Sequence, residues 1–229
     1  MKIEIKKQLK DALYNLITDA KKEKFDQLAA LRTRHLTVAV ENIYQEHNAS
    51  AVMRTCDCFG VQDLHIIEKS NKFTIQRDIA MGATRWVNHY HYSDEKFPTT
   101  KCIEHLKQKG YKIVATTPHE QDTEIYHLDV SQPIALLFGT EKTGLSETAL
   151  QQADEYIRIP MYGFTESFNI SVSAALSLQI LRKKLEEQTA VNWLLSEEEI
   201  VDLKIQWCKK IIKNAEVVER DLLRRIEKM

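Results

Sequence analysis

The chain has 229 residues, of which 43% are hydrophobic and 28% charged, and this length is enough for one domain with a sizeable core. It contains no run of about 18 apolar residues, which excludes a membrane span, and it starts without the short apolar segment of a signal peptide. Four scattered cysteines form neither a disulfide framework nor paired zinc knuckles. We therefore expect a reduced, cytoplasmic protein with no bound metal.

Basic side chains are concentrated at the two ends of the chain, although the net charge is only −1. Residues 1–34 contain nine Lys and Arg against five acids, and residues 202–229 contain eight against five. The pI of about 6.7 argues against a nucleic-acid-binding protein, because such domains often have a pI above about 9. A charged helix face is often only solvated, so the basic ends do not by themselves establish RNA contact.

Short strands and helices alternate after a first amphipathic helix, which apolar spacing predicts over residues 6–24. Strands are predicted by short apolar or alternating runs at 36–40, 61–67, 86–92, 111–117, 133–138 and 156–160. Helices are predicted between them at 48–59, 103–110 and 169–184, the first two ending on Gly60 and Gly110. This alternation predicts an α/β fold, with a mainly parallel sheet flanked by helices.

The last part of the chain is predicted to be helical. Ser196 to Glu199 form a capping box, and apolar residues then repeat at helical spacing from Ile200 to Ile226. We therefore divide the chain into a helical extension over residues 1–30, an α/β domain over 31–188 and a basic helical extension over 189–229.

The first group of unusual polar residues follows the first predicted strand, in the segment ENIYQEHNASAVMR (41–54). Asn48 or Ser50 is expected to be the N-cap of the next helix. From this cap we expect Arg54 to share a helix face with the Asn48 amide, at the carboxyl edge of the sheet where open α/β folds bind ligands. The alternative is a structural cap followed by a surface arginine.

The second group is LLFGTEKTGLS (136–146), in which a strand leads through a glycine loop into a helix. Such a loop presents backbone amides to a ligand. The segment nearly matches the phosphate-binding pattern G-x-x-x-x-G-K-[ST], but Leu145 occupies the lysine position, which argues against an NTPase. Glu141 and Lys142 are instead expected to orient loops or partner groups.

The third group is IPMYGFTESFNISVS (159–173), where a strand ends in a Pro/Gly loop and Ser167 and Asn169 open a long helix. The loop offers backbone amides and apolar walls to an adenine ring. The alternative is a plain connection between a strand and a helix.

In this order and spacing, the three segments resemble the motifs of the SpoU family of SPOUT RNA methyltransferases, particularly its TrmH-type tRNA (guanosine-2′-O-)-methyltransferases. The first family motif, E-N-…-H-N-x-S-A-x-x-R-T-x-D-x-x-G, is matched over residues 41–60. The second, G-x-E-K-x-G-[LIV]-[ST], is matched over 139–146, and the third, I-P-M-x-G-x-x-x-S-L-N-[VI]-S-V, over 159–172. The resemblance covers residues 30–185.

The resemblance implies a C-terminal trefoil knot, which topology rules treat as a rare exception, and a homodimer with cofactor sites beside the interface. The implied cofactor is S-adenosylmethionine (AdoMet), whose methyl group is already activated by its positive sulfur, so no metal is needed. In the family AdoMet is held mainly by backbone and apolar contacts. The corresponding residues here are Thr116, Gly139, Ile159, Met161 and Phe168, with Phe168 in place of the usual leucine.

The active-site positions of the family fall on Asn48, Arg54, Glu141, Ser167 and Asn169. Arg54 is the expected principal catalytic residue. It either deprotonates the ribose hydroxyl or, because a guanidinium is a poor base, stabilises the developing alkoxide and clamps the neighbouring phosphate. Asn48 would orient Arg54 or the ribose, and Ser167 and Asn169 would position the ribose and the cofactor loop.

The implied substrate is RNA, and we expect the 2′-hydroxyl of guanosine 18 in the D loop of tRNA. Only a short charged helix precedes residue 30, whereas relatives acting on large ribosomal RNA commonly carry a separate N-terminal RNA-binding domain. Residues 32–48 also resemble the TrmH type more than other branches. The residues expected to contact RNA are Arg32, Arg34, His47, Arg182 and Lys183.

Three alternatives remain at this point. The substrate could be ribosomal RNA or another tRNA position, and the family's Gln-Arg-Gln-Arg run after the third motif is replaced here by residues 182–185, with Leu185 at the expected second basic position. A catalytically idle RNA-binding module is disfavoured because Asn48, Arg54 and Asn169 are all present. A Rossmann-type nucleotide enzyme is disfavoured because no G-x-G-x-x-G follows a strand.

Overall fold

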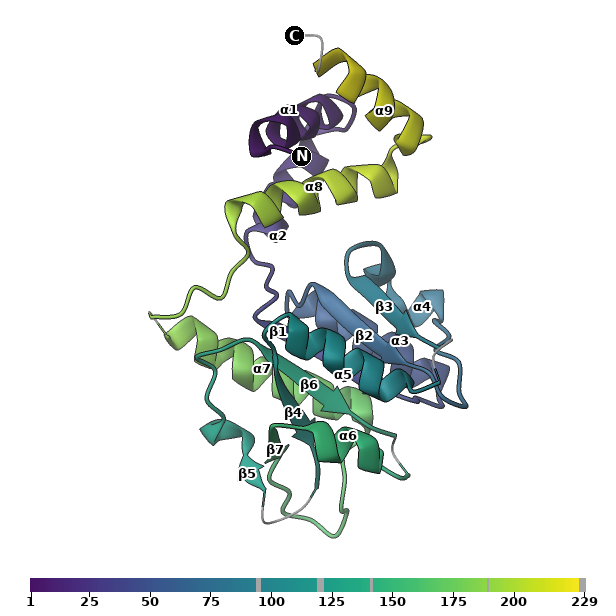
Figure 1. The fold of residues 1–229 in the computed structure, drawn as a ribbon, viewed down its shortest axis with the longest axis vertical. Helices are drawn as coiled ribbons and strands as arrows, with labels where there is room; N and C mark the ends of the chain where they lie inside the picture. The colour runs from purple at the N-terminus through teal and green to yellow at the C-terminus, as the bar shows by residue number, and fades with distance from the viewer. Residues whose placement is uncertain (94–95, 119–121, 141, 189, 227–229) are drawn as a thin grey trace. The chain divides into compact units, whose positions relative to one another are not determined.

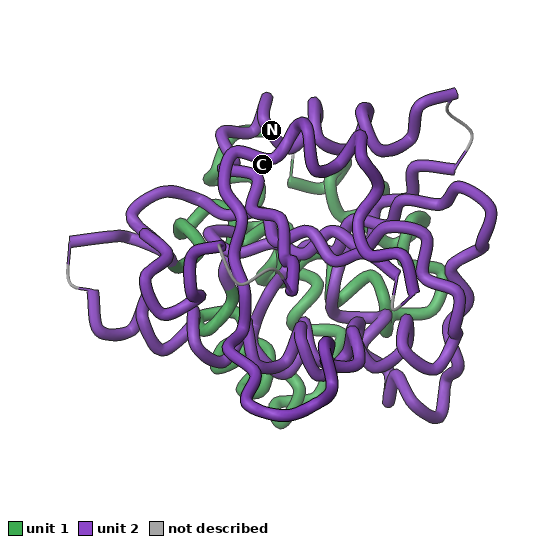
Figure 2. Tube along the Cα trace, turned by 90° about the horizontal axis from the view of Figure 1, so that it is seen from below, with its two compact units in different colours: residues 1–32, 194–229 green, residues 33–193 purple. Residues whose placement is uncertain are grey.

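The described chain consists of two compact units, residues 33–193 and residues 1–32 with 194–229 (Figures 1 and 2). We call the first the sheet unit and the second the helical unit. The structure is a computed structural model, and it describes residues 1–93, 96–118, 122–140, 142–188 and 190–226. No helix in these ranges is long and apolar enough to cross a membrane.

The sheet unit is built on a parallel sheet with strand order β3-β2-β1-β6-β4-β7-β5. Its strands are β1 (Leu36–Glu41), β2 (Asp63–Ile67), β3 (Asn88–Tyr92), β4 (Lys112–Thr116), β5 (Thr123–Glu124), β6 (Ile134–Phe138) and β7 (Glu155–Arg158). β1 and β6 are entirely buried, as expected for central parallel strands covered on both faces. The predicted α/β class with a parallel sheet is confirmed.

Two helical layers cover the sheet, because successive strand side chains point to opposite faces. Val38 and Val40 belong to a core shared with α3 (Glu46–Cys58) and α7 (Ile170–Glu187). Ala39, between them, belongs to a second core shared with α5 (Pro98–Gln108) and α6 (Glu147–Gln152). Shorter elements connect the layers: α4 (Arg77–Ala80), η1 (Ala83–Arg85) and η2 (Ile125–His127). Figure 1 shows the covering helices α3, α5, α6 and α7 beside the strands.

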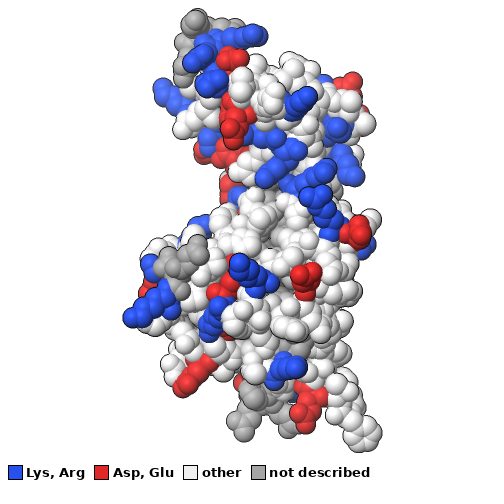
Figure 3. Space-filling view, turned by 90° about the vertical axis from the view of Figure 1, so that its right-hand side faces the viewer, with Lys and Arg blue, Asp and Glu red and all other residues white. Residues whose placement is uncertain are grey.

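The helical unit contains α1 (Ile3–Tyr14), α2 (Asp19–Ala29), α8 (Glu197–Ile211) and α9 (Ala215–Ile226). The predicted capping box at Ser196 is confirmed. The single helix predicted over 6–24 is wrong, because the chain turns at residues 15–18, and the Tyr14 hydroxyl donates to Asp26 at 2.9 Å across the turn. On the face drawn in Figure 3, Lys and Arg side chains are denser on this unit than on the sheet unit.

Several of the N-terminal lysines form ion pairs within the helical unit. The Lys6 ammonium lies 2.8 Å from Glu198 and 2.7 Å from Asp202, and Lys7 pairs with Glu197 at 2.5 Å. These contacts bind α1 to α8, whose first turns carry the acids. The basic N-terminus therefore contributes to packing as well as to surface charge.

Candidate functional site

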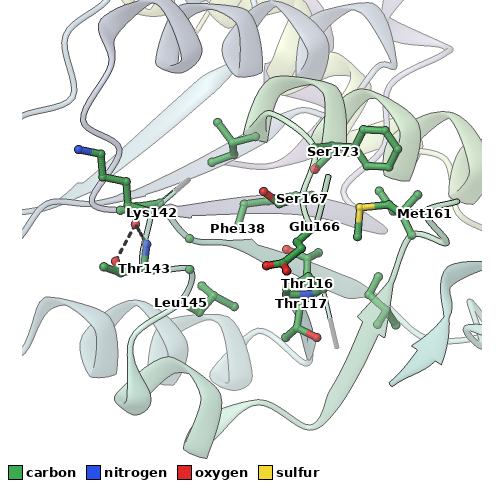
Figure 4. A pocket seen from close by; sticks show the side chains of 18 of the residues that line it. Thr116, Thr117, Phe138, Lys142, Thr143, Leu145, Met161, Glu166, Ser167 and Ser173 are labelled. Carbon is green, nitrogen blue, oxygen red and sulfur yellow. Dashed lines mark hydrogen bonds between the residues drawn. The ribbon is translucent and has the colours of Figure 1, made fainter. Parts of the chain in front are cut away.

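A cavity of about 410 Å³ lies where β4, β6 and β7 end (Figure 4). Its walls come from the end of β4 with residues 117–118, the described residues 139–140 and 142–145 of the glycine loop after β6, the loop after β7 and the first turn of α7. The carboxyl ends of strands are where open parallel sheets bind ligands. The volume is within the range of about 300–1,000 Å³ that holds small organic ligands.

All five residues that the family resemblance assigned to the cofactor line this one cavity. They are Thr116, Gly139, Ile159, Met161 and Phe168. Ser167 lines it as well, and Figure 4 shows its hydroxyl and the Met161 thioether turned toward the cavity. Apolar walls with a few polar groups suit an adenine ring and an aliphatic tail, so the residues present fit AdoMet.

The glycine loop closes tightly on itself. The backbone N–H of Thr140 donates to Gly144 O at 3.1 Å, and Gly144 N–H donates back to Thr140 O at 3.0 Å. A Cβ at Gly139 would lie 2.1 Å from the carbonyl carbon of Gly144, so only glycine permits this approach. Lys142 lines the cavity, but its ammonium group points away in Figure 4, and Glu141 lies outside the described residues.

Two of the predicted active-site amides are in contact although they are 121 residues apart. Asn169, at which the long third-motif helix was predicted to open, is the N-cap of α7, with its Oδ1 accepting from Ser171 N–H at 2.9 Å. Its Nδ2 donates to Asn48 Oδ1 at 3.0 Å, and Asn48 in turn donates to Gln45 Oε1 at 3.0 Å. Asn48 is only 2% exposed whereas Asn169 is exposed, so this pair joins a buried residue of the first motif to the surface at the start of α7.

The predicted N-cap at Asn48 or Ser50 is wrong. α3 begins at Glu46 with Gln45 as its N-cap, so both residues lie inside the helix. The Ser50 hydroxyl donates to Glu46 O at 2.8 Å and accepts from Gln76 N–H at 2.8 Å, which attaches the start of α4 to α3. Asn48 is used for the contact with Asn169 instead of capping.

The predicted shared face of Asn48 and Arg54 is also wrong. Six residues at about 100° each place Arg54 about 120° around the helix from Asn48. Accordingly Asn48 is buried and Arg54 is exposed. Arg54 does not line the cavity, and within the described part of the chain it makes no hydrogen bond or ion pair. The Arg54 side chain is exposed on α3, outside the cavity lining.

Three of the five residues predicted to contact RNA are arginines whose side chains interact with other residues of the same chain. Arg32 is 3% exposed, with its guanidinium 5.4 Å from the ring centre of Trp207. Arg34 pairs with Asp63, its Nε lying 3.0 Å from the carboxylate. Burial of Arg32 leaves almost none of its side chain for a phosphate, so the structure argues against that assignment.

Arg182 is similarly engaged, whereas His47 and Lys183 are exposed. The Arg182 guanidinium lies 4.3 Å from the centre of the Trp193 ring and donates to Phe59 O at 3.1 Å. Leu185, at the expected second basic position, is completely buried in the core. Leu185, which departs from the family's Gln-Arg-Gln-Arg run, therefore packs in the core, and a basic residue at this position would not lie on the surface.

Sequence reasoning assigned no role to Glu41, which is 3% exposed at the end of β1. Its carboxylate accepts from Ser146 N–H and the Ser146 hydroxyl, both at 2.7 Å, and from Thr99 Oγ1 at 2.5 Å. The Lys69 ammonium lies 2.9 Å away. Burial alone would raise the pKa of Glu41, but these hydrogen bonds and Lys69 hold it below its usual value.

Glu166 and Ser173 also line the cavity without having been predicted, and Figure 4 shows the Glu166 carboxylate turned toward Thr116 and Thr117. Spacing in the sequence gave no signal for either residue. Whether they line a cavity depends on how the loop after β7 and the start of α7 fold over the sheet edge.

Comparison with known proteins shows which family the chain resembles. The model of the SpoU rRNA Methylase family matches residues 35–179. The tRNA (guanosine(18)-2'-O)-methyltransferase of Borreliella burgdorferi is 40% identical over 90% of this chain and 93% of its own length. The solved A. aeolicus TrmH/SpoU tRNA modifying enzyme is similar with a TM-score of 0.75 and 30% identity, over 85% of this chain and 98% of that one.

A third structure, the SpoU methyltransferase AviRb from Streptomyces viridochromogenes in complex with the cofactor AdoMet, has a TM-score of 0.59 and 20% identity, over 71% of this chain and 65% of that one. This likeness shows a shared fold. The family match over the three motifs and the 40% identical relative lead to one assignment: the chain belongs to the SpoU methylase family.

Proposed function

We propose that this protein transfers the methyl group of AdoMet to the ribose 2′-hydroxyl of guanosine 18 in tRNA. The observation that carries the proposal is the cavity at the carboxyl edge of the sheet, into which the segments after β4, β6 and β7 bring all five expected cofactor residues. The tRNA target is supported by the B. burgdorferi relative, which bears that name and aligns with nearly the whole chain.

In this proposal the residues of the cavity bind the cofactor, and Arg54 outside the cavity contacts the RNA. AdoMet, when bound, supplies an activated methyl group, and the apolar walls around Ile159, Met161 and Phe168 bind it and exclude water. Ser167 positions the ribose at the cavity, and the Asn48–Asn169 pair holds the start of α7. Arg54, open to solvent, clamps an RNA phosphate and stabilises the developing alkoxide. Glu141 lies outside the described residues, and its assignment to the active site rests on the family resemblance alone.

We further propose that two copies assemble through the surface beside the cavity. Tyr162 is 97% and Phe164 108% exposed in the loop after β7, and Val172 on α7 is 43% exposed. Neighbouring large apolar side chains left in water mark a surface that a partner covers. Analytical ultracentrifugation should show a dimer that Tyr162→Asp with Phe164→Asp converts to a monomer. A monomeric parent protein would rule this assembly out.

The remaining expectations follow from family membership. Residues 31–188 form the methyltransferase domain with a C-terminal trefoil knot, and residues 1–30 and 189–229 are its helical extensions. His47 and Lys183 are the most accessible of the expected RNA contacts, supported by the partly exposed Arg34 and Arg182. We also propose a cytoplasmic location, which the proposed tRNA substrate supports.

The activity is tested by incubating the purified protein with tritiated AdoMet and either unmodified bulk tRNA or ribosomal RNA. Transfer of tritium to tRNA alone is the expected result. Transfer to ribosomal RNA alone would show that the proposed tRNA substrate is wrong and that the methyltransferase activity is right. RNA binding without any transfer would make the protein an idle RNA-binding module.

A further inference from the structure

Glu41 connects three separate parts of the sheet unit through one buried carboxylate. Thr99 belongs to the first turn of α5, Lys69 follows β2, and Ser146 ends the glycine loop and begins α6. All four groups that contact the carboxylate are donors: two hydroxyls, one backbone N–H and one ammonium. A carboxylate satisfies them together because it accepts hydrogen bonds and donates none.

The glycine loop is attached to β1 at both of its ends. It starts after Phe138, which is paired in register with Val40 of β1. It ends at Ser146, whose N–H and hydroxyl both donate to Glu41, the last residue of β1. Ser146 also caps α6 by accepting from Ala149 N–H at 3.3 Å. Residues 139–145 between these two attachments form one wall of the cavity, apart from position 141, which lies outside the described chain.

We infer that Glu41 is a positioning residue for AdoMet binding, acting through Ser146 on the glycine loop. This inference rests on the proposed function, because the cavity is taken to hold AdoMet. Glu41 lies behind the loop and does not line the cavity itself. Hydrogen bonds to a charged acceptor are about twice as strong as neutral ones, so the carboxylate holds the loop end more firmly than an amide could.

The test uses substitutions on the two sides of the Glu41–Ser146 contact. In Glu41→Gln the new NH₂ group faces a cluster of donors, so the loop end loses a partner. In Ser146→Ala the hydroxyl's bond to Glu41 and its cap of α6 are lost, and the backbone N–H bond to Glu41 stays. Thr37→Val is the matched control. Thr37 lies in β1, as Glu41 does, and its buried hydroxyl donates to Asp63 O of β2 at 2.7 Å, away from the loop.

Isothermal titration calorimetry with AdoMet should give a Kd raised about tenfold in Glu41→Gln, which corresponds to about 1.4 kcal/mol. Ser146→Ala should raise the Kd less, about threefold, because only one of the two Ser146 hydrogen bonds to the carboxylate is lost and the backbone N–H bond stays. The double variant should bind no more weakly than Glu41→Gln, because both act through one contact. The KM for AdoMet should rise in parallel while kcat stays within about twofold of the parent value. Thr37→Val should lower the thermal unfolding temperature and leave the Kd unchanged.

Unchanged AdoMet affinity in a folded Glu41→Gln or Ser146→Ala protein would overturn the inference, as would an equal loss of affinity in Thr37→Val. If Glu41→Gln does not fold, Ser146→Ala decides the question alone. A parent protein that binds no AdoMet would instead refute the proposed function, and the inference with it.

Discussion

Replacing Gly139 with alanine should destroy the cofactor cavity with the smallest possible change in the chain. The added Cβ would lie 2.1 Å from the Gly144 carbonyl carbon and 2.2 Å from both Gly144 O and Leu145 N, whereas Cβ contacts in proteins essentially never fall below 3.0 Å. The neighbours are backbone atoms, so the loop must open by about 0.9 Å, the difference between 2.1 and 3.0 Å. A misplacement of about 1 Å at a reacting site costs on the order of 100-fold.

The assay is AdoMet binding by calorimetry together with methyl transfer to tRNA, and circular dichroism confirms the fold. Gly163→Ala is the matched control, because a Cβ there meets nothing within 4 Å. We expect methyl transfer to fall by about 100-fold in Gly139→Ala, with weaker AdoMet binding, and both to remain at the parent value in Gly163→Ala. A folded Gly139→Ala protein with parent-like affinity would refute the assignment of this loop to the cofactor.

Three further outcomes follow from the geometry. Arg54→Ala should lower kcat by at least about 100-fold with AdoMet affinity unchanged, since Arg54 is outside the cavity lining; calorimetry showing lost affinity would make it a cofactor residue. Phe168→Asp should weaken AdoMet binding by placing a charge in the apolar wall, and equal affinity in a folded variant would move the pocket elsewhere. The pKa of Glu41 in the folded protein is below its ordinary value of 4.5. The ionised Glu41 therefore contributes its full share to the free energy of unfolding above pH 4.5, and this share is lost as the pH falls through the folded pKa. Urea unfolding should therefore show the stability gap between the parent and Glu41→Gln narrowing below pH 4.5, and a constant gap would contradict the ion's role.

Local patterns predicted those parts of the fold that depend on neighbouring residues. The buried strands appear as apolar runs because both faces of a parallel sheet are covered, and β1 and β6 match their predicted ranges within one residue. The caps at Asn169 and Ser196 were predictable because a capping side chain bonds to a backbone group two or three residues ahead.

Contacts between distant segments could not be predicted in the same way. The Asn48 side chain is used by Asn169, and the Glu41 side chain by Thr99 and Ser146, partners that lie 58 to 121 residues away. The motif match named Asn48 and Asn169 as site residues, but spacing along a helix gave Asn48 the wrong position and Arg54 the wrong face. The three-dimensional path of the loops decides which side chains reach the cavity.

Mapping the methylated nucleotide in the product decides whether the protein is a guanosine 18 methyltransferase. An unmodified tRNA transcript is incubated with the purified protein and AdoMet, and 2′-O-methyl positions are mapped by their resistance to alkaline cleavage. We expect one new resistant position, at guanosine 18, that is absent without AdoMet. Methylation at another nucleotide, or none in a folded protein that binds AdoMet, would contradict this expectation.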